Sequence, residues 1–298
     1  MSEGAVRRFE EITARWREAV DAGLLDQART LAEEALAVAE ESQEPPLVRR
    51  ARCNRAQILI ELGEGDSVLG VLRGLLTESR EPDTTFHSAY ALARAYDLKG
   101  DRAKALFYAR IAQGHALTAT NPEFVCWAHN LLGCIYLGES HFEKALHEFE
   151  AALAVGASPV REALVRDNLG YCLVVLGRIP EGLPHLYRSV RVLRRLCPAF
   201  ARLPHLALSV AFLDLNRLQR ATRHGRAALH SADAEGDREA AKMALYLLGE
   251  VAKQAGDYSL ARSYFGVLQT RYYPENSRLA DVLLTVDTRQ LVNLKAQR

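Results

Sequence analysis

The residues that could carry acid–base, nucleophilic or metal chemistry are scattered along this chain of 298 residues. Cys126 and His129 lie one helical turn apart, as in a thiolate–imidazole pair, but a structural contact within one helix is the favoured interpretation. His141 and His147 are six residues apart, so the HExxH zinc arrangement is absent. Phosphate-binding glycine loops and the GxSxG nucleophile motif are absent too. We therefore expect no catalytic activity, no metal site and no cofactor.

Composition excludes further classes of protein. The net charge is +1, so no global field draws the chain to nucleic acid or to a membrane. No apolar run approaches the roughly 18 residues that cross a bilayer, and the charged N-terminus lacks the pattern of a secretory signal. The five cysteines are odd in number and form no CxxC pair, which indicates reduced thiols. These features predict a cytoplasmic protein without a membrane segment.

The elements that would position any site follow a repeat. A small residue recurs at intervals of 37 to 40 residues, except in the first copy, which has Trp16. These marker residues are Trp16, Ala56, Ala93, Gly133, Gly170, Ser209 and Gly249. Seven residues after each marker stands a Gly, or Ser140 or Asn216 in its place. Apolar residues at helical spacing on both sides of this position predict a pair of helices joined by a tight turn.

The clearest copy reads Leu132-Gly133, Tyr136, Phe142, Ala145, Phe149 and Ala152. This pattern resembles the tetratricopeptide repeat, with a longer period than usual, as in bacterial regulators that bind peptides. The resemblance implies an all-α, right-handed superhelical solenoid of about seven helix pairs and a C-terminal capping helix. We expect a single solenoid with repeats over 4–44, 47–80, 84–120, 123–156, 160–197, 200–234 and 238–273, and the cap over 277–296.

The same resemblance implies a concave groove lined by the first helix of each pair. Carrying the family's groove offsets onto this chain selects Tyr90, Arg94, Asn130, Cys134, Leu137, Asp167, Tyr171, Val174, Leu206, Val210 and Leu213. Such a groove would hold a partner peptide or helix, which makes a non-catalytic, regulatory interaction scaffold the leading hypothesis. The alternative is that these side chains pack against neighbouring helices of the solenoid.

Charge is distributed unevenly. Ten arginines lie between Arg178 and Arg226, opposed only by Glu181 and Asp214, whereas the first 47 residues hold eleven acidic and five basic residues. A convex basic patch is expected on second helices, formed by Arg188, Arg191, Arg195, Arg220 and Arg223. It would contact an acidic protein surface or nucleic-acid phosphates, the alternative function. Head-to-tail association of copies into a homo-oligomer is a third option, and a solvated face without a partner is the fourth.

Overall fold

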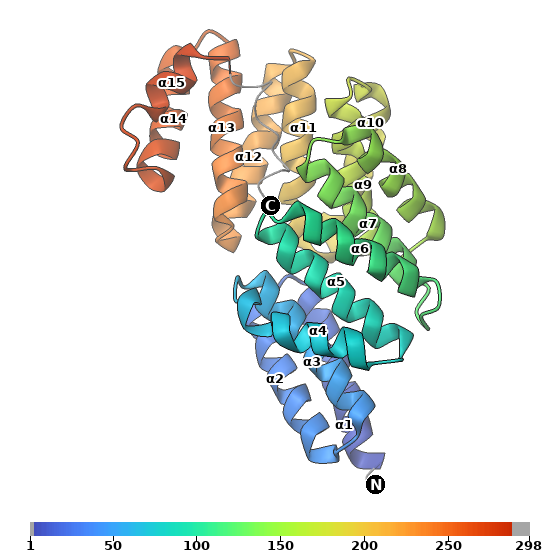
Figure 1. The fold of residues 1–298 in the computed structure, drawn as a ribbon. Coiled ribbons are helices and arrows are strands. Elements are labelled where there is room, and N and C mark those ends of the chain that lie inside the picture. Colours follow the sequence, from blue (N-terminus) through green and yellow to red (C-terminus); the bar gives the residue numbers. More distant parts are fainter. Residues whose placement is uncertain (1–2, 288–298) are drawn as a thin grey trace. The chain divides into compact units, whose positions relative to one another are not determined.

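The computed structural model describes residues 3–287, and all regular elements in this range are helical (Figure 1). The predicted all-α class is therefore confirmed. The α-helices are α1 (Glu3–Asp21), α2 (Leu25–Ser42), α3 (Pro45–Glu61), α4 (Leu69–Glu78), α5 (Pro82–Leu98), α6 (Arg102–Ala116), α7 (Glu123–Gly138), α8 (Phe142–Val155), α9 (Pro159–Val175), α10 (Ile179–Leu196), α11 (Arg202–Asp214), α12 (Leu218–Glu235), α13 (Arg238–Gln254), α14 (Tyr258–Tyr272) and α15 (Leu279–Thr285). Two 3₁₀ helices, η1 (Gly65–Val68) and η2 (Pro198–Phe200), precede α4 and α11.

The turns within the helix pairs lie where the repeat predicts them. Each of these seven turn residues has a positive φ: Gly23, Gly63, Gly100, Ser140, Gly177, Asn216 and Gly256. Ser140 and Asn216 adopt φ of 59° and 54°, a region that costs a residue with a Cβ more than it costs glycine. The turn geometry therefore outweighs local preference at these two positions.

Close packing of the two helices within a pair explains the small marker residues. A Cβ on Gly133 would lie 2.5 Å from Cε1 of Phe149, and a Cβ on Gly170 would lie 2.7 Å from Cγ of Leu186. In the sixth pair the hydroxyl of Ser209 donates a hydrogen bond of 3.0 Å to the carbonyl of Ala221. A larger side chain at these markers would separate the helices.

Two segments depart from the simple repeat. The second helix of the second pair begins as η1 and continues as the short α4. Its first turn carries Val68 twelve residues after the marker, where the other six pairs have Ala or Gly. The continuous helix predicted over 277–296 is interrupted within the described residues: α15 ends at Thr285, and Val286 is extended. The ammonium of Lys253 donates to the carbonyls of Leu283 and Val286, at 2.7 and 3.0 Å, which holds this helix end against α13. The rest of that predicted helix, 288–296, lies outside the described residues.

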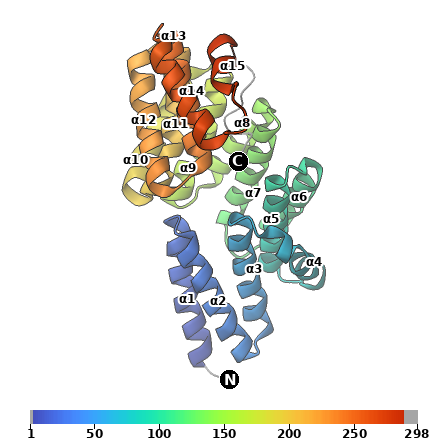
Figure 2. The same ribbon diagram turned by 90° about the vertical axis from the view of Figure 1, so that its left-hand side faces the viewer.

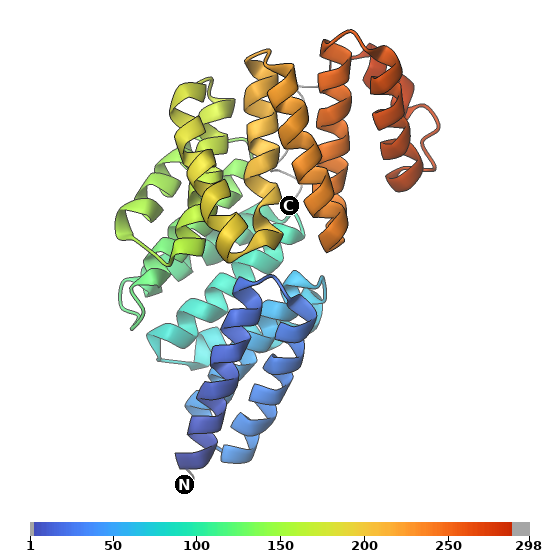
Figure 3. The same cartoon turned by 180° about the vertical axis from the view of Figure 1, so that it is seen from behind.

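The chain divides into two compact units, which are described separately. Unit 1 comprises Met1–Ile135 and His147–Ser158, and unit 2 comprises Tyr136–Leu146 and Pro159–Arg298. In unit 1, α1, α2 and α3 lie side by side, and α3 contacts α5, the first helix of the next pair (Figure 2). In unit 2, α9 contacts α11 and α11 contacts α13, so first helices again neighbour one another (Figure 3). Both units thus follow the stacking that a helix-pair repeat requires.

Candidate functional site

Aromatic side chains of unit 1 gather where α5 and α7 meet. Phe86 of α5 and Phe124 of α7 are buried and stacked, with ring centroids 4.2 Å apart. Beside them lie Tyr90 and Trp127, partly exposed, with centroids 6.0 Å apart. The ring of His87 meets Trp127 edge-on at 6.1 Å. This arrangement leaves a partly exposed aromatic surface, here called the α5–α7 face, formed by His87, Tyr90, Arg94, Trp127, Asn130 and Cys134.

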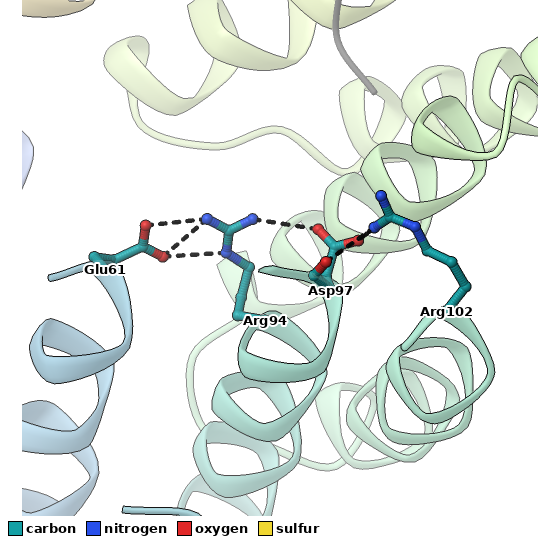
Figure 4. A network of polar contacts seen from close by, with 4 residues as sticks. All are labelled: Glu61, Arg94, Asp97 and Arg102. Atoms are coloured by element: carbon teal, nitrogen blue, oxygen red, sulfur yellow. Dashed lines mark hydrogen bonds and ion pairs between the residues drawn. The ribbon is translucent and has the colours of Figure 1, made fainter. Parts of the chain in front are cut away.

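An ionic network holds Arg94 at one end of the α5–α7 face (Figure 4). Its guanidinium donates to both carboxylate oxygens of Glu61 at 3.0 Å and lies 3.6 Å from the carboxylate of Asp97. Arg102 donates to the same Asp97 carboxylate and to its backbone carbonyl. The negative charge of Glu61 raises the pKa of Arg94, whereas burial raises the pKa of Asp97. Arg94 is thus a fixed cation that still keeps about a quarter of its side-chain area, 24%, in solvent.

The predicted groove residues fall into two groups. Five are partly exposed: Tyr90, Arg94, Asn130, Cys134 and Val210. Six are buried: Leu137, Asp167, Tyr171, Val174, Leu206 and Leu213. The four exposed members that lie in unit 1 all belong to the α5–α7 face, and Val210 lies in unit 2.

Sequence reasoning missed His87, Trp127 and Glu61. His87 and Trp127 stand six residues before the markers Ala93 and Gly133, so an aromatic ring repeated at one offset was the signal that could have found them. Glu61 lies 33 residues from Arg94 in the chain, and only the contact of α3 with α5 brings the two together.

The ring of His87 gives unit 1 a dependence on pH. Burial among the aromatic rings lowers its pKa from 6.5 to about 4. Between about pH 6.5 and pH 4, His87 is therefore protonated in the unfolded chain and neutral in the folded chain. We expect this residue to reduce stability by about 2 kcal/mol between pH 7 and pH 5, at about 1.4 kcal/mol for each pKa unit.

The variant His87→Phe should accordingly lose this part of the pH dependence and unfold at a higher temperature than the unmodified protein at pH 5. Thermal melts followed by circular dichroism at pH 5, 6 and 7 measure the effect. His147→Phe, at an exposed position, is the control and should keep the original slope. An equal slope in both variants would contradict the assignment to His87.

The five predicted basic-patch residues are all exposed in unit 2. Arg188, Arg191 and Arg195 follow one side of α10, and Arg220 and Arg223 lie one turn apart on α12. Arg188 forms an ion pair of 3.1 Å with Glu162, and the guanidinium of Arg220 lies over the ring of Phe212 at 5.4 Å.

Neither metal chemistry nor membrane insertion is indicated by the described part of the chain. Residues 3–287 contain no group of three or more His, Cys, Asp or Glu side chains placed to hold a metal ion. No helix among them combines the length and apolar character needed to cross a bilayer.

Comparison with known proteins shows which families and solved structures this chain is similar to. Residues 4–79 match the model of the tetratricopeptide repeat family. No curated protein matches the sequence significantly. Among solved structures, a Rap protein complexed with competence and sporulation factor aligns with a TM-score of 0.70 and 14% identity, over 93% of this chain and 80% of that one. Aspartyl phosphate phosphatase F from Bacillus subtilis aligns with a TM-score of 0.60 and 12% identity, over 95% and 93%. BtubC from P. vanneervenii aligns with 0.58 and 20% identity, over 70% and 91%.

Proposed function

Since residues 4–79 match the tetratricopeptide repeat family and both units are stacks of helix pairs, we propose that this protein is an interaction scaffold whose α5–α7 face captures a peptide or helix of a regulatory partner. The carrying observation is the partly exposed pair Tyr90 and Trp127 beside the fixed cation Arg94. Rigid aromatic rings and arginine are the side chains that most often dominate binding energy at protein interfaces.

The two kinds of group have distinct tasks. Apolar side chains of the partner pack on Tyr90 and Trp127, which lose little conformational freedom because neighbouring rings already hold them. Arg94 binds a backbone carbonyl or carboxylate of the partner, and its ion pair with Glu61 orients it before the partner arrives. Capture then needs little reorganisation of the face.

A regulatory role is supported by the architecture. Each helix pair contacts mainly its neighbours, so a ligand bound across two pairs changes their relative packing, and such changes add along a repeat. One similar structure is a Rap protein complexed with competence and sporulation factor. In this proposal the protein has no catalytic activity of its own and acts in the cytosol, where its five free cysteines stay reduced.

Replacing Tyr90, whose ring is partly exposed, tests the proposal. Tyr90→Ala should lower retention of the bound partner about 30-fold, the effect of a residue that contributes about 2 kcal/mol. Quantitative affinity capture from the native cell extract, with unmodified and variant protein compared by mass spectrometry, gives the measurement. Phe107→Ala removes another aromatic ring of unit 1, 61% exposed and outside the α5–α7 face, and should change nothing. Equal retention by both variants would exclude capture through Tyr90.

A further inference from the structure

Unit 2 carries a group of exposed cations that have no internal ion-pair partner. Within the described residues, Arg191, Arg194 and Arg195 of α10 and Arg223 and Arg226 of α12 form no ion pair. Unit 1 differs, because its arginines at 49, 50, 52 and 55 each pair with a carboxylate. Cations close together without counter-ions repel one another. Binding of an acidic partner would relieve this repulsion and is therefore electrostatically favourable at this surface.

Helix α12 and the neighbouring α11 meet at a pair of histidines. The Nδ1 atoms of His205 in α11 and His224 in α12 lie 2.9 Å apart, in a hydrogen bond. Tyr187 of α10 meets the ring of His224 edge-on at 6.1 Å, which places α10 beside α12 at this point.

Arginine charges on α10 and α12 contribute to the lowered pKa values of the two histidines. Burial first, and then the charges of Arg194 and Arg223, lower the pKa of His205. Burial, the neighbouring His205 and the charges of Arg223 and Arg220 lower the pKa of His224 to about 4. Burial thus favours the neutral form of both imidazoles, and the charges of Arg194, Arg220 and Arg223 add to this effect.

Exposed apolar side chains lie among the arginines. Tyr187 is 41% exposed, Leu196 follows Arg195 at 48%, and Leu215 is 38% exposed. A mixture of arginine, tyrosine and leucine is typical of a surface that binds protein. A surface that binds single-stranded nucleic acid usually presents several aromatic rings on which bases stack. Among the residues named here, Tyr187 is the one exposed ring.

We propose that this α10–α12 face, formed by Tyr187, Arg191, Arg194, Arg195, Leu196, Arg220, Arg223 and Arg226 around His205 and His224, is a second docking surface that binds an acidic segment of a partner protein. The carboxylates of that segment pair with the arginines, and its apolar side chains pack on Tyr187 and Leu196. This surface is independent of the capture proposed for the α5–α7 face, since the two lie in different units.

A second copy of this chain is a poorer occupant, although its first 47 residues are acidic. Glu10 pairs with Arg50, Glu33 with Arg55, and Glu40 with Arg52. Glu11 and Glu34 also pair with arginines of the same unit. Five of the eleven acidic residues are thus engaged within their own unit, which lowers the attraction that this end offers to the arginines of another copy.

The test uses a labelled peptide of glutamates interrupted by leucines, a matched peptide with Gln in place of Glu, and labelled oligothymidylate. We expect the full-length protein to bind the Glu peptide about ten-fold more tightly than the Gln peptide or the oligonucleotide. Arg191→Glu with Arg223→Glu should weaken Glu-peptide binding roughly 100-fold, since each reversal adds like-charge repulsion. Fluorescence anisotropy gives the affinities.

The control is Arg15→Glu with Arg80→Glu, which makes the same change of charge at two exposed arginines of unit 1 that form no ion pair with described residues. It should keep peptide binding within about two-fold. If the α10–α12 reversal fails to fold, Arg191→Gln with Arg223→Gln replaces it, with an expected loss of about ten-fold.

The pKa of His224 reports whether the peptide binds at the α10–α12 face. Bound carboxylates offset the charges of Arg223 and Arg220 and should therefore raise the pKa of His224 from about 4, measured by NMR titration of the imidazole. Tyr90→Ala should leave peptide binding unchanged, so failure of the α5–α7 proposal does not affect this result. Tighter binding of oligothymidylate would replace the acidic segment by nucleic acid, and peptide binding that survives the reversal would overturn the docking surface.

Discussion

Replacing Gly249 by alanine should destabilise unit 2 by about 3 kcal/mol, the upper range for overpacking a core. The added Cβ would meet the ring of Phe265, with 2.6 Å to both Cδ1 and Cζ. That ring is fully buried between α13 and α14 and cannot swing into solvent, so the two helices must separate. Urea unfolding, followed by circular dichroism, should show a clearly lower midpoint.

Gly266 provides a matched control for Gly249. It lies in α14, where an added Cβ would have nothing within 4 Å. Gly266→Ala should stabilise the protein by about 0.5 to 1 kcal/mol, because alanine favours the helix over glycine. Adding Phe265→Leu to Gly249→Ala should restore part of the loss by making room for the Cβ. A neutral Gly249→Ala variant would contradict the close helix contact.

Removing Arg94 should cost unit 1 about 3 kcal/mol, because the buried carboxylate of Asp97 loses one of its two cationic neighbours. The side chain of Asp97 is only 6% exposed and would keep Arg102 alone as its cationic neighbour, while Glu61 loses its bidentate donor. Urea unfolding of Arg94→Ala against the unmodified protein measures the loss. Arg80→Ala, at an exposed position, should change stability by less than about 0.5 kcal/mol.

The loss in Arg94→Ala should also depend on pH. Burial already raises the pKa of Asp97, and without Arg94 that pKa rises further. A carboxyl whose folded pKa exceeds its unfolded value destabilises the fold at high pH, and the penalty disappears as acid protonates it. The deficit relative to the unmodified protein should therefore be smaller at pH 5 than at pH 8. A deficit that is constant with pH would exclude uncompensated Asp97 as the cause.

The helix pairs were predictable because each unit repeats a short local pattern. A small residue at the marker, a turn residue seven positions later and helical apolar spacing fix two helices without long-range information. Even Ser140 and Asn216, which replace glycine, keep its positive φ. The stop of α15 was not predictable, since the carbonyls at its end are held by Lys253, some 30 residues earlier.

The candidate site was only partly predictable, because exposure depends on packing between helix pairs. Family offsets selected Tyr90 and Arg94, which are partly exposed, and equally Tyr171 and Leu206, which are buried. No pattern in the sequence distinguishes these two outcomes. The pair Glu61–Arg94 joins two different helix pairs, so only the structure brings it together. The contact of His205 with His224 recurs at the same spacing of 19 residues in His129–Glu148 and Arg166–His185, and that recurrence was a signal available in the repeat.

Among the five cysteines, the partly exposed one lies on the α5–α7 face and can report chemically on that surface. Cys53, Cys126, Cys172 and Cys197 are buried, and burial raises the pKa of Cys53 to about 11, whereas Cys134 is partly exposed beside Asn130. A bulky maleimide should therefore alkylate Cys134 first in the folded protein. The rate of that single reaction becomes a protection assay on the unmutated chain: a partner seated on the face slows it, and one docked on unit 2 leaves it unchanged.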